Sequence, residues 1–552
     1  MVSPALEQVA RELAGTVKPV KVNVDEASKL SERFSVQSVP TLLVIREART
    51  VDRRTARCRR RSGASQGLSI AKDIWLLAIG SRSSSTRSAN RCTGLREAGM
   101  RHDHRLASLA AMTSTSPRIV IVGGGFAGLF SARQLQRRLR REAELLFVTP
   151  RNFMTYQPFL AEAATGTLEP RHVVVPLRRV LPGVEVLSAR ATRVAHLDHC
   201  VTVQPSEGPS YDVSYDHLVL AVGAVTRLPP IPGLEECGIG FKRVEEAIAL
   251  RNHVLSRLDL AETTRDADVR RCALTFVVVG GGFAGIEALG ELEDMTRSAC
   301  RYYRHVRPAD LHWMLVELTG RILHEVGEGV GRRAAAELSR RGIDLRLNAR
   351  VESAVDRRIR LSDGTELNAG TLVWTAGVQP HPMLRSTDLP LDEKGRVRVG
   401  TDLRVVGTED AWSAGDCAAV PDLTNRGVTT PPTAQHAVRQ ARHLADNLVA
   451  VLRGESVRPY AHRYAGSIAS LGLHKGVAEL YGMQLRGLPA WVLHRTYHLT
   501  QIPTINRKVR IGLDWALASL FRRDLVSLGG IRETSDSSEG TEVRPREHAA
   551  VH

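Results

Sequence analysis

Two stretches of the chain repeat the same order of hydrophobic strand, glycine turn and helix. Residues 119–122 and 276–279 are short hydrophobic runs, each followed by Gly-x-Gly-x-x-Gly and by apolar positions at helical spacing. The first turn contains Gly123, Gly125, Phe126, Ala127 and Gly128, and the second contains Gly280, Gly282 and Gly285. Such a turn brings the amino end of a helix close to a pyrophosphate. We therefore predict an α/β protein with two Rossmann-like dinucleotide-binding domains.

The order of the strands indicates that one of these domains is inserted into the other. Apolar strands at 218–222 and 371–375 each lead to a glycine, Gly223 and Gly377, where a cofactor could approach the backbone. A further strand leads to Gly415-Asp416. We expect the following division: residues 117–237 and 371–465 form the first domain, and residues 238–370 form the inserted second domain.

The two copies differ in the residue that follows their second strand, and this residue influences which dinucleotide binds. In the second copy, the strand at 313–316 ends in Glu317, which is placed to accept hydrogen bonds from ribose hydroxyls. A carboxylate there would repel a 2′-phosphate, so this site should prefer NAD(H). In the first copy, Thr149 follows the strand, with Arg151 close behind and no acid. The first site must hold its adenosine ribose differently.

The amino-terminal part differs in composition from the rest of the chain. Residues 20–24 and 39–44 have strand patterns, and residues 1–45 resemble the second half of a thioredoxin domain, with Pro40 at that family's proline position. Because the segment has no Cys-x-x-Cys, we expect a partial thioredoxin-like segment without dithiol exchange. Residues 46–115 are rich in Arg and Ser, and only 74–79 could form an element, so we expect a disordered linker. The alternative is that the functional protein begins at Met112.

Composition limits the partners. The 552 residues carry a formal net charge of +17, which favours an anionic partner, either a membrane surface or a nucleic acid. Aromatic content is only 5%, and no zinc or base-stacking pattern accompanies the basic runs, so we expect no specific nucleic acid. The seven cysteines have no metal-binding spacing, and we expect no metal. No apolar run reaches the roughly 20 residues of a membrane span, and no secretion signal is evident, so we expect a cytoplasmic body.

The carboxyl-terminal region combines apolar and basic positions. Between 506 and 523, Leu513, Leu517, Leu520 and Phe521 fall on one side at helical spacing, with Trp515 at its edge and basic residues around them. A helix of this kind lies in the plane of a membrane interface, so we assign residues 466–531 to a membrane-associating region. The alternative is a helix packed on its own domain or on the other subunit of a homodimer. Residues 532–552 are polar and acidic, and we expect a disordered tail.

These motifs together resemble the type II NADH:quinone oxidoreductases over about residues 117–531. The matching segments are 285–292, Glu317 with 321–323, 414–416 and 431–440. The resemblance implies that FAD binds the first glycine turn with Gly415 and Asp416, and that NADH binds the second turn. It also implies that Glu287 contacts the nicotinamide region and relays protons, and that Gln435 lies on the quinone side.

The resemblance further implies the reaction. NADH would pass a hydride to FAD, and a quinone would then be reduced near Gln435, without proton pumping, on the cytoplasmic side of the cell membrane. A soluble FAD-dependent NADH oxidase, a ferredoxin-type reductase and a non-catalytic NADH-sensing flavoprotein stay open as alternatives. Disulfide reductases of this architecture have two cysteines soon after the first glycine turn, and no cysteine lies between Gly125 and His199. Sulfide:quinone reductases need redox cysteines near the flavin, and no pair is placed for that, so sulfide oxidation is disfavoured.

Overall fold

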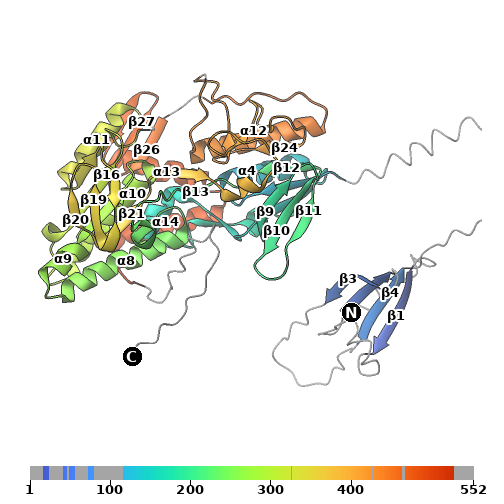
Figure 1. The fold of residues 1–552 in the computed structure, drawn as a ribbon, viewed down its shortest axis with the longest axis horizontal. Helices are drawn as coiled ribbons and strands as arrows, with labels where there is room; N and C mark the ends of the chain where they lie inside the picture. The colour runs from blue at the N-terminus through green and yellow to red at the C-terminus, as the bar shows by residue number, and fades with distance from the viewer. Residues whose placement is uncertain are drawn as a thin grey trace, which may run out of the picture. The chain divides into compact units, whose positions relative to one another are not determined.

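A computed structural model describes residues 116–527, except 325, 426, 463–465 and 522, and four strands nearer the amino terminus. The chain divides into two compact units, and the division falls between Met112 and Thr113. Figure 1 shows the elements of each unit. Pro40, the start at Met112 and the tail at 532–552 lie outside the described residues.

The amino-terminal unit contains a four-stranded sheet with the order β1-β4-β2-β3. Its strands are β1 (Val17–Asn23), β2 (Thr41–Arg46), β3 (Arg49–Thr55) and β4 (Asp73–Ile79). β4 runs antiparallel to β1 and parallel to β2. The patterns at 20–24 and 39–44 predicted β1 and β2, and the segment 74–79, where only an element of unstated type was expected, forms β4. β3 was not predicted, because its sequence Arg-Thr-Val-Asp-Arg-Arg-Thr has little apolar content, and its presence with β4 means that the expected linker contains two strands.

The first nucleotide fold is built on a seven-stranded sheet with the order β11-β10-β9-β6-β5-β12-β24. Its strands are β5 (Arg118–Val122), β6 (Glu144–Thr149), β9 (Glu185–Ala195), β10 (Cys200–Pro205), β11 (Tyr211–Ser214), β12 (His217–Leu220) and β24 (Ala411–Ser413). The strands from β9 to β24 are parallel, whereas β10 and β11 form an antiparallel extension. Because β24 comes from a distant part of the sequence, the chain leaves this fold after β12 and returns to it.

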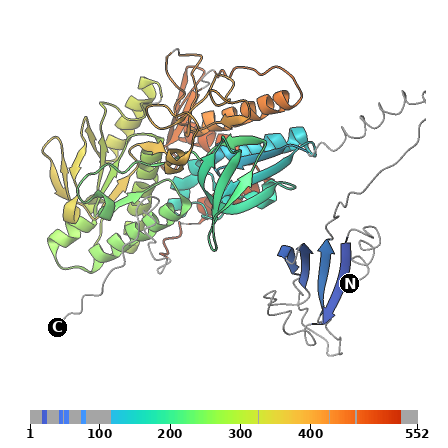
Figure 2. The same cartoon turned by 45° about the vertical axis from the view of Figure 1, so that its right-hand side comes forward.

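Two helices, α4 (Phe126–Leu139) and α12 (Ala434–Leu452), lie side by side in this domain (Figures 1 and 2). The α4 helix follows the first glycine turn directly, and α12 belongs to the returning part of the chain. The buried residues of α12, which include Ala437, Ala441, Leu444 and Leu448, recur at spacings of three and four, so that one stripe of the helix faces the core. The packing of α12 on α4 therefore joins the two sequence-distant halves of the domain.

The second nucleotide fold has a five-stranded, fully parallel sheet with the order β14-β21-β15-β16-β17. Its strands are β14 (Gly238–Gly240), β15 (Thr275–Val279), β16 (His312–Glu317), β17 (Asp344–Leu347) and β21 (Thr371–Trp374), and its main helices are α8 (Val244–Thr263), α10 (Phe283–Ala299) and α11 (Glu328–Arg340). All five residues of β15 are buried, as a continuous hydrophobic run in a central parallel strand requires. Since β21 pairs with β15, the boundary expected at 370 lies after this strand instead.

The two connections between the nucleotide folds pair with each other. After Gly223 the chain forms β13 (Ala224–Thr226), and after Gly377 it forms β22 (Val378–Pro380). These short strands are antiparallel partners, with Val225 opposite Gln379. Both glycines have positive φ, 72° and 81°, so the chain turns at the same place on each crossing.

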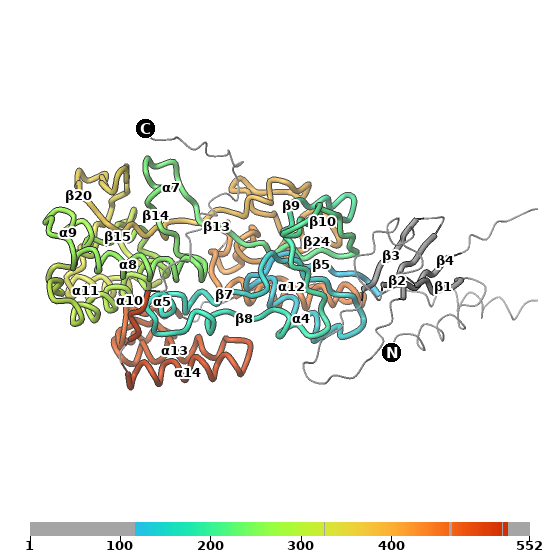
Figure 3. Tube along the Cα trace, turned by 90° about the horizontal axis from the view of Figure 1, so that it is seen from below, coloured from blue at the N-terminus to red at the C-terminus, as the bar shows by residue number. Residues whose placement is uncertain are grey.

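The region expected to associate with a membrane has two parts. Residues 466–486 form a three-stranded sheet of β26 (Gly466–Ser470), β27 (Gly476–Leu480) and β28 (Met483–Arg486), which packs against α10 and α11. Two helices follow, α13 (Leu488–Gln501) and α14 (Ile505–Leu520), and they lie side by side (Figure 3). The expected region thus consists of a small sheet followed by a helix pair.

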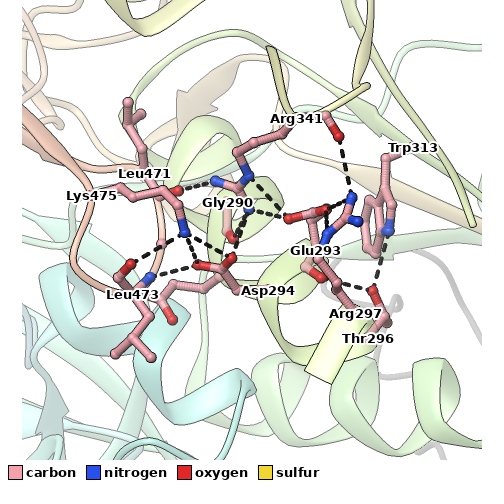
Figure 4. Close-up of polar contacts among 12 residues, drawn as sticks. Gly290, Glu293, Asp294, Thr296, Arg297, Trp313, Arg341, Leu471, Leu473 and Lys475 are labelled. Carbon is pink, nitrogen blue, oxygen red and sulfur yellow. Dashed lines mark hydrogen bonds and ion pairs between the residues drawn. The ribbon is translucent and has the colours of Figure 1, made fainter. Parts of the chain in front are cut away.

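A buried ion-pair network ties the loop between β26 and β27 to α10 (Figure 4). Arg341 pairs with Glu293 and lies 3.3 Å from Asp294, and its side chain is only 6% exposed. It also donates to the Gly290 carbonyl at 2.9 Å and to that of Leu471. On the other side, Lys475 lies 3.1 Å from the Asp294 carboxylate. One arginine thus satisfies two carboxylates and two carbonyls that have little access to water.

Replacing this arginine should destabilise the protein. The substitution Arg341→Met removes one of the two arginines that pair with the buried Glu293, and the loss of a partner from a buried ion pair costs about 3 kcal/mol. The free energy of unfolding in urea should fall accordingly. The neighbouring Arg340, whose pair with Glu337 is 68% exposed on the arginine side, provides the control, and Arg340→Met should have little effect. Equal effects of the two substitutions would contradict the structural role of Arg341.

Candidate functional site

The first glycine turn leaves an open space at the amino end of α4. A Cβ added at Gly128 would lie 1.9 Å from the Gly123 carbonyl oxygen, and one at Gly123 would lie 2.2 Å from that of Ala221. At Gly125, in contrast, an added Cβ would meet none of the described heavy atoms within 4 Å. No described side chain caps α4, so the N–H groups of its first turn are available to an external acceptor. This arrangement fits the pyrophosphate of a dinucleotide.

Gly415 and Asp416 lie against this turn. A Cβ at Gly415 would be 3.0 Å from the Cβ of Ala127, so the returning chain contacts the start of α4. The Gly415 N–H donates to Oε1 of Gln440 at 2.9 Å, and Gln440 donates in turn to Thr430 at 2.9 Å. Burial raises the pKa of Asp416, and the nearby Lys242 opposes that shift. Burial also lowers the pKa of Lys242, which Asp416 opposes, so these two charges face each other in a poorly hydrated place.

A cavity of about 190 Å³ lies beside these residues. Its lining comes from the Gly415-Asp416 loop, from the crossing strands and from the amino end of α12, and includes Ala224, Gln379, Asp416, Thr433, His436 and Gln440. The Thr433 side chain caps α12 by accepting from the His436 N–H at 3.3 Å. The positive end of the α12 dipole therefore faces the cavity, where it would stabilise negative charge on a bound ring.

The second glycine turn repeats the geometry of the first. A Cβ at Gly285 would lie 1.9 Å from the Gly280 carbonyl oxygen. Gly282 caps α10 with extended backbone and without a side-chain hydrogen bond, and its carbonyl accepts from the Ile286 N–H at 3.0 Å. Here too the first turn of the helix has free N–H groups among the described residues, which fits a second pyrophosphate.

Glu317 ends β16, as the sequence indicated, and is anchored by the protein itself. Its Oε2 accepts from the Gly281 N–H at 2.6 Å, and its Oε1 accepts from the backbone and hydroxyl of Thr319, each at 2.8 Å. The carboxylate is only 6% exposed. Each carboxylate oxygen can accept more than one hydrogen bond, so Glu317 can fix the glycine turn and still accept from a ribose hydroxyl.

Glu287 is part of a buried chain of polar groups that runs into α13. Its Oε1 accepts from the Ser470 N–H at 3.2 Å and lies 3.1 Å from Nε2 of His494. The ring of His494 is 4.6 Å from that of His498, and Nδ1 of His498 lies 3.1 Å from the Tyr156 hydroxyl. Burial lowers the pKa of His498 well below its usual value and raises that of Tyr156. The two groups are therefore neutral near pH 7.

Three other predicted site residues have side-chain contacts with the protein itself: Gln435, Arg151 and Phe126. Gln435 is in the first turn of α12, but it contacts Arg439 at 3.5 Å and is not among the residues that line the cavity. The next residue, His436, does line it and shares a 3.0 Å hydrogen bond with Tyr460. Arg151 lies 3.9 Å from Glu245, at the start of α8. Phe126 begins α4, and its ring is 5.7 Å from that of Tyr156.

Several residues of the site were missed by the sequence reasoning. Gln440 stands inside the segment 431–440 that carried the resemblance, but nothing in its spacing indicated a bond to Gly415. Tertiary packing alone brings three of these residues to their partners: Lys242, His494 and His498. The sequence separations are large, such as the 207 residues between Glu287 and His494. No local pattern could have identified them.

An exposed apolar face covers the two carboxyl-terminal helices. Ile505, Val509, Leu513 and Leu517 recur every four residues along α14 and are each more than half exposed, and Leu488 and Val492 extend this face onto α13. Trp515, expected at the edge of this face, instead points inward and donates to Oε2 of Glu162 at 2.7 Å. Within the described part of the chain, no helix is long and apolar enough to cross a membrane.

Comparisons with known proteins agree with this geometry. The family model of the pyridine nucleotide-disulphide oxidoreductases matches residues 117–441, and the thioredoxin model matches residues 1–64. The mitochondrial internal alternative NAD(P)H-ubiquinone oxidoreductase A1 of Solanum tuberosum is 31% identical over 77% of this chain and 90% of its own length. The type II NADH:quinone oxidoreductase Ndh of Mycobacterium tuberculosis is 30% identical, over 74% of this chain and 89% of its own. The chain belongs to the type II NADH:quinone oxidoreductases.

The fold agrees with that of a solved relative of this type II oxidoreductase. The structure of NDH2 from Plasmodium falciparum in complex with NADH superimposes with a TM-score of 0.69, covering 75% of this chain and 100% of that chain at 18% identity. The match to the thioredoxin model extends beyond residue 45, into the range of β3. Both resemblances drawn from the sequence are thus confirmed.

The open position at Gly125 gives a direct test of the first nucleotide site. The substitution Gly125→Ala adds a methyl group that the protein can accommodate, since φ is −85° and no described atom is near, but that would occupy space needed by FAD. Overfilling a packed site costs about 1–3 kcal/mol, so FAD affinity should fall about tenfold or more.

The control is Gly512→Ala on α14, where an added Cβ is equally unhindered. Both variants should keep the circular dichroism of the unaltered protein, and only Gly125→Ala should lose flavin absorbance. Full flavin content in Gly125→Ala would contradict the placement of FAD at this turn.

Proposed function

We propose that this protein transfers two electrons from NADH to a membrane quinone, with FAD as its bound cofactor and without proton pumping. The observation that carries the proposal is the pair of glycine turns, each with an open helix end, in a chain whose relatives are NADH:quinone oxidoreductases. FAD supplies the ability to take a hydride from NADH and to pass the two electrons to a quinone.

The residues of the first domain are suited to hold FAD. The amino end of α4 at Gly125 would bind the pyrophosphate, and Asp416 would accept hydrogen bonds from the ribityl hydroxyls. Gln440 positions Gly415 by its 2.9 Å hydrogen bond and thereby fixes the loop that carries Asp416. The amino end of α12 would stabilise negative charge on the reduced ring.

The residues of the second domain are suited to hold NADH. The amino end of α10 would bind the pyrophosphate, and Glu317 would accept from a ribose hydroxyl while it holds the Gly281 N–H at 2.6 Å. The anchored carboxylate disfavours a 2′-phosphate, which supports NADH over NADPH as the preferred donor.

Quinone reduction also consumes a proton from the medium, because NADH delivers a hydride and a quinol carries two protons. Glu287 and His494, 3.1 Å apart and buried, are suited to hold such a proton close to the second glycine turn. His494 contributes a further nitrogen, Nδ1, that has no hydrogen-bond partner among the described residues. We propose that Glu287 holds this proton and that His494 positions it.

The proposed role of Gln435 on the quinone side gives a test of the function. The variant Gln435→Leu removes an amide near the amino end of α12 without altering Gln440 or the Gly415 loop. It should keep its FAD, and NADH should still bleach the flavin absorbance at the original rate. Steady-state quinone turnover should fall about tenfold, which corresponds to the loss of one hydrogen bond of about 1.5 kcal/mol.

Anaerobic stopped-flow absorbance would measure the two half-reactions separately. The variant Gln204→Leu, on the distant strand β10, serves as the control and should behave as the unaltered protein does. Unchanged quinone kinetics in Gln435→Leu would remove the role assigned to this residue.

We further propose that α13 and α14 attach the protein to the cytoplasmic surface of the cell membrane. The apolar face of Ile505, Val509, Leu513 and Leu517 supports this attachment, as do the basic residues Arg507, Lys508 and Arg510 on the same helix. The inner side of the helix pair is already used: Arg495 donates to Glu162 at 2.9 Å and Arg523 to Glu291 at 3.0 Å. The apolar face is thus fixed outward.

The double substitution Leu513→Glu/Leu517→Glu should weaken this attachment strongly. Each leucine contributes about 1.5–3 kcal/mol when it leaves water, so binding to lipid vesicles should fall more than about tenfold. Flotation of the protein with phosphatidylcholine vesicles measures the bound fraction. The control is Leu197→Glu, because Leu197 is also an exposed leucine, at 85%, but lies in the turn after β9. Equal binding by the two variants would contradict attachment through α14.

A further inference from the structure

A basic cavity of about 270 Å³ lies apart from the nucleotide sites, between α4, α12 and the turn that joins α13 to α14. Its lining contains four cationic side chains and no acidic one: Arg133 and Arg137 of α4, Arg442 of α12 and Lys508 of α14. The first two are four residues apart on one helix, so they project from the same face, and this pairing of like charges is unfavourable by itself.

The positive charge in this cavity is not neutralised by the described residues around it. Asp446, the acidic residue of α12 nearest in sequence to Arg442, already has other partners. It accepts a hydrogen bond from Gln134 at 2.9 Å and pairs with Arg138 at 3.1 Å. Burial, together with Arg137 and Arg442, lowers the pKa of Arg133, which indicates repulsion without compensation. A guanidinium stays protonated in proteins, so an anion bound among these side chains would relieve this repulsion.

The side chains are arranged for an anion that accepts several hydrogen bonds. Arg442 lies over the Phe130 ring at 5.3 Å, which orients its guanidinium group. Lys508 is held by its donation to the Thr500 carbonyl at 2.9 Å and keeps further ammonium protons free for a ligand. Arginine forks match the oxygens of a phosphate group particularly well.

The position of the cavity in the fold indicates whether its phosphate ligand is a lipid headgroup or a free phosphate. Lys508 stands between Ile505 and Val509, which are 80% and 55% exposed and begin the apolar face of α14. Ile502 and Pro503, which also line the cavity, connect it to that face. A lipid with its acyl chains beside Ile505 and Val509 would have its phosphate within reach of the arginines. A free phosphate would gain nothing from this apolar border.

We propose that this cavity, the α4–α12–α14 pocket, binds the phosphate of an anionic phospholipid and thereby fixes the protein at the membrane surface. The inference rests on the proposed membrane attachment and adds to it a specific lipid site. It predicts a preference for anionic over zwitterionic membranes that depends on two residues of α4, a helix outside the apolar membrane-facing surface.

The test compares flotation of the full-length FAD-loaded protein with two kinds of vesicle, phosphatidylcholine alone and phosphatidylcholine mixed with phosphatidylglycerol. The double substitution Arg133→Gln/Arg137→Gln should weaken binding to the mixed vesicles about thirtyfold, because each basic residue near an anionic surface contributes about 1 kcal/mol. Binding to pure phosphatidylcholine should not change. Arg133→Lys/Arg137→Lys, which keeps the charge, should restore a large part of the preference.

The matched control, Arg190→Gln/Arg193→Gln, removes the same charge from exposed positions on β9 and should bind both vesicles nearly as the unaltered protein does. An equal loss in this control would show that net charge alone matters and would overturn the pocket. So would a loss that is equal on both kinds of vesicle.

Two further outcomes separate the pocket from the proposals on which it rests. If the unaltered protein binds neither vesicle, membrane attachment and the lipid pocket both fail, whereas binding without any anionic preference overturns the pocket alone. Inorganic phosphate provides the last arm. If it raises the thermal midpoint of the unaltered protein but not of Arg133→Gln/Arg137→Gln, and the vesicle preference is the same in both, the ligand is a soluble phosphate and the lipid proposal is wrong.

Discussion

In both nucleotide folds, the helix after the glycine turn lies so close to the preceding strand that the third glycine touches the carbonyl oxygen of the first. An added Cβ would be 1.9 Å from that oxygen at Gly128 and again at Gly285. This contact fixes each helix end with its free N–H groups at the edge of its sheet. The cavity beside Gly415 and the carboxylate of Glu317 are both positioned against these turns, so the whole redox site depends on this backbone approach.

A second constraint connects that site to the protein surface. The carboxyl-terminal region is attached to both nucleotide folds through buried charges. Arg495 of α13 pairs with Glu162 of the first fold, and Arg523, just after α14, pairs with Glu291 of the second. Burial raises the pKa of Glu291, and the positive charge of Arg523 opposes this shift. The same helices carry His494 toward Glu287. The helix pair therefore carries both the exposed apolar face and the histidine that contacts Glu287.

The sequence predicted what depends on local pattern and missed what depends on tertiary contact. The pattern of hydrophobic residues along the chain predicted three features of the fold. They are the glycine turns, the inserted domain and the outward positions of Leu513 and Leu517. Trp515 was misplaced, because helical spacing cannot show that a buried carboxylate such as Glu162 attracts an indole N–H. Likewise, the bond of Gln440 to Gly415 and the contact of His494 with Glu287 join segments whose proximity only the folded chain creates.

The central claim is that electrons pass from NADH to a quinone through this chain. The most direct measurement is anaerobic stopped-flow absorbance of the purified flavoprotein, with NADH added first and a soluble quinone second. We expect fast bleaching of the flavin by NADH and recovery by the quinone at a rate no slower than steady-state turnover. Recovery only with oxygen or with a protein acceptor would contradict the claim, although the two nucleotide sites would remain.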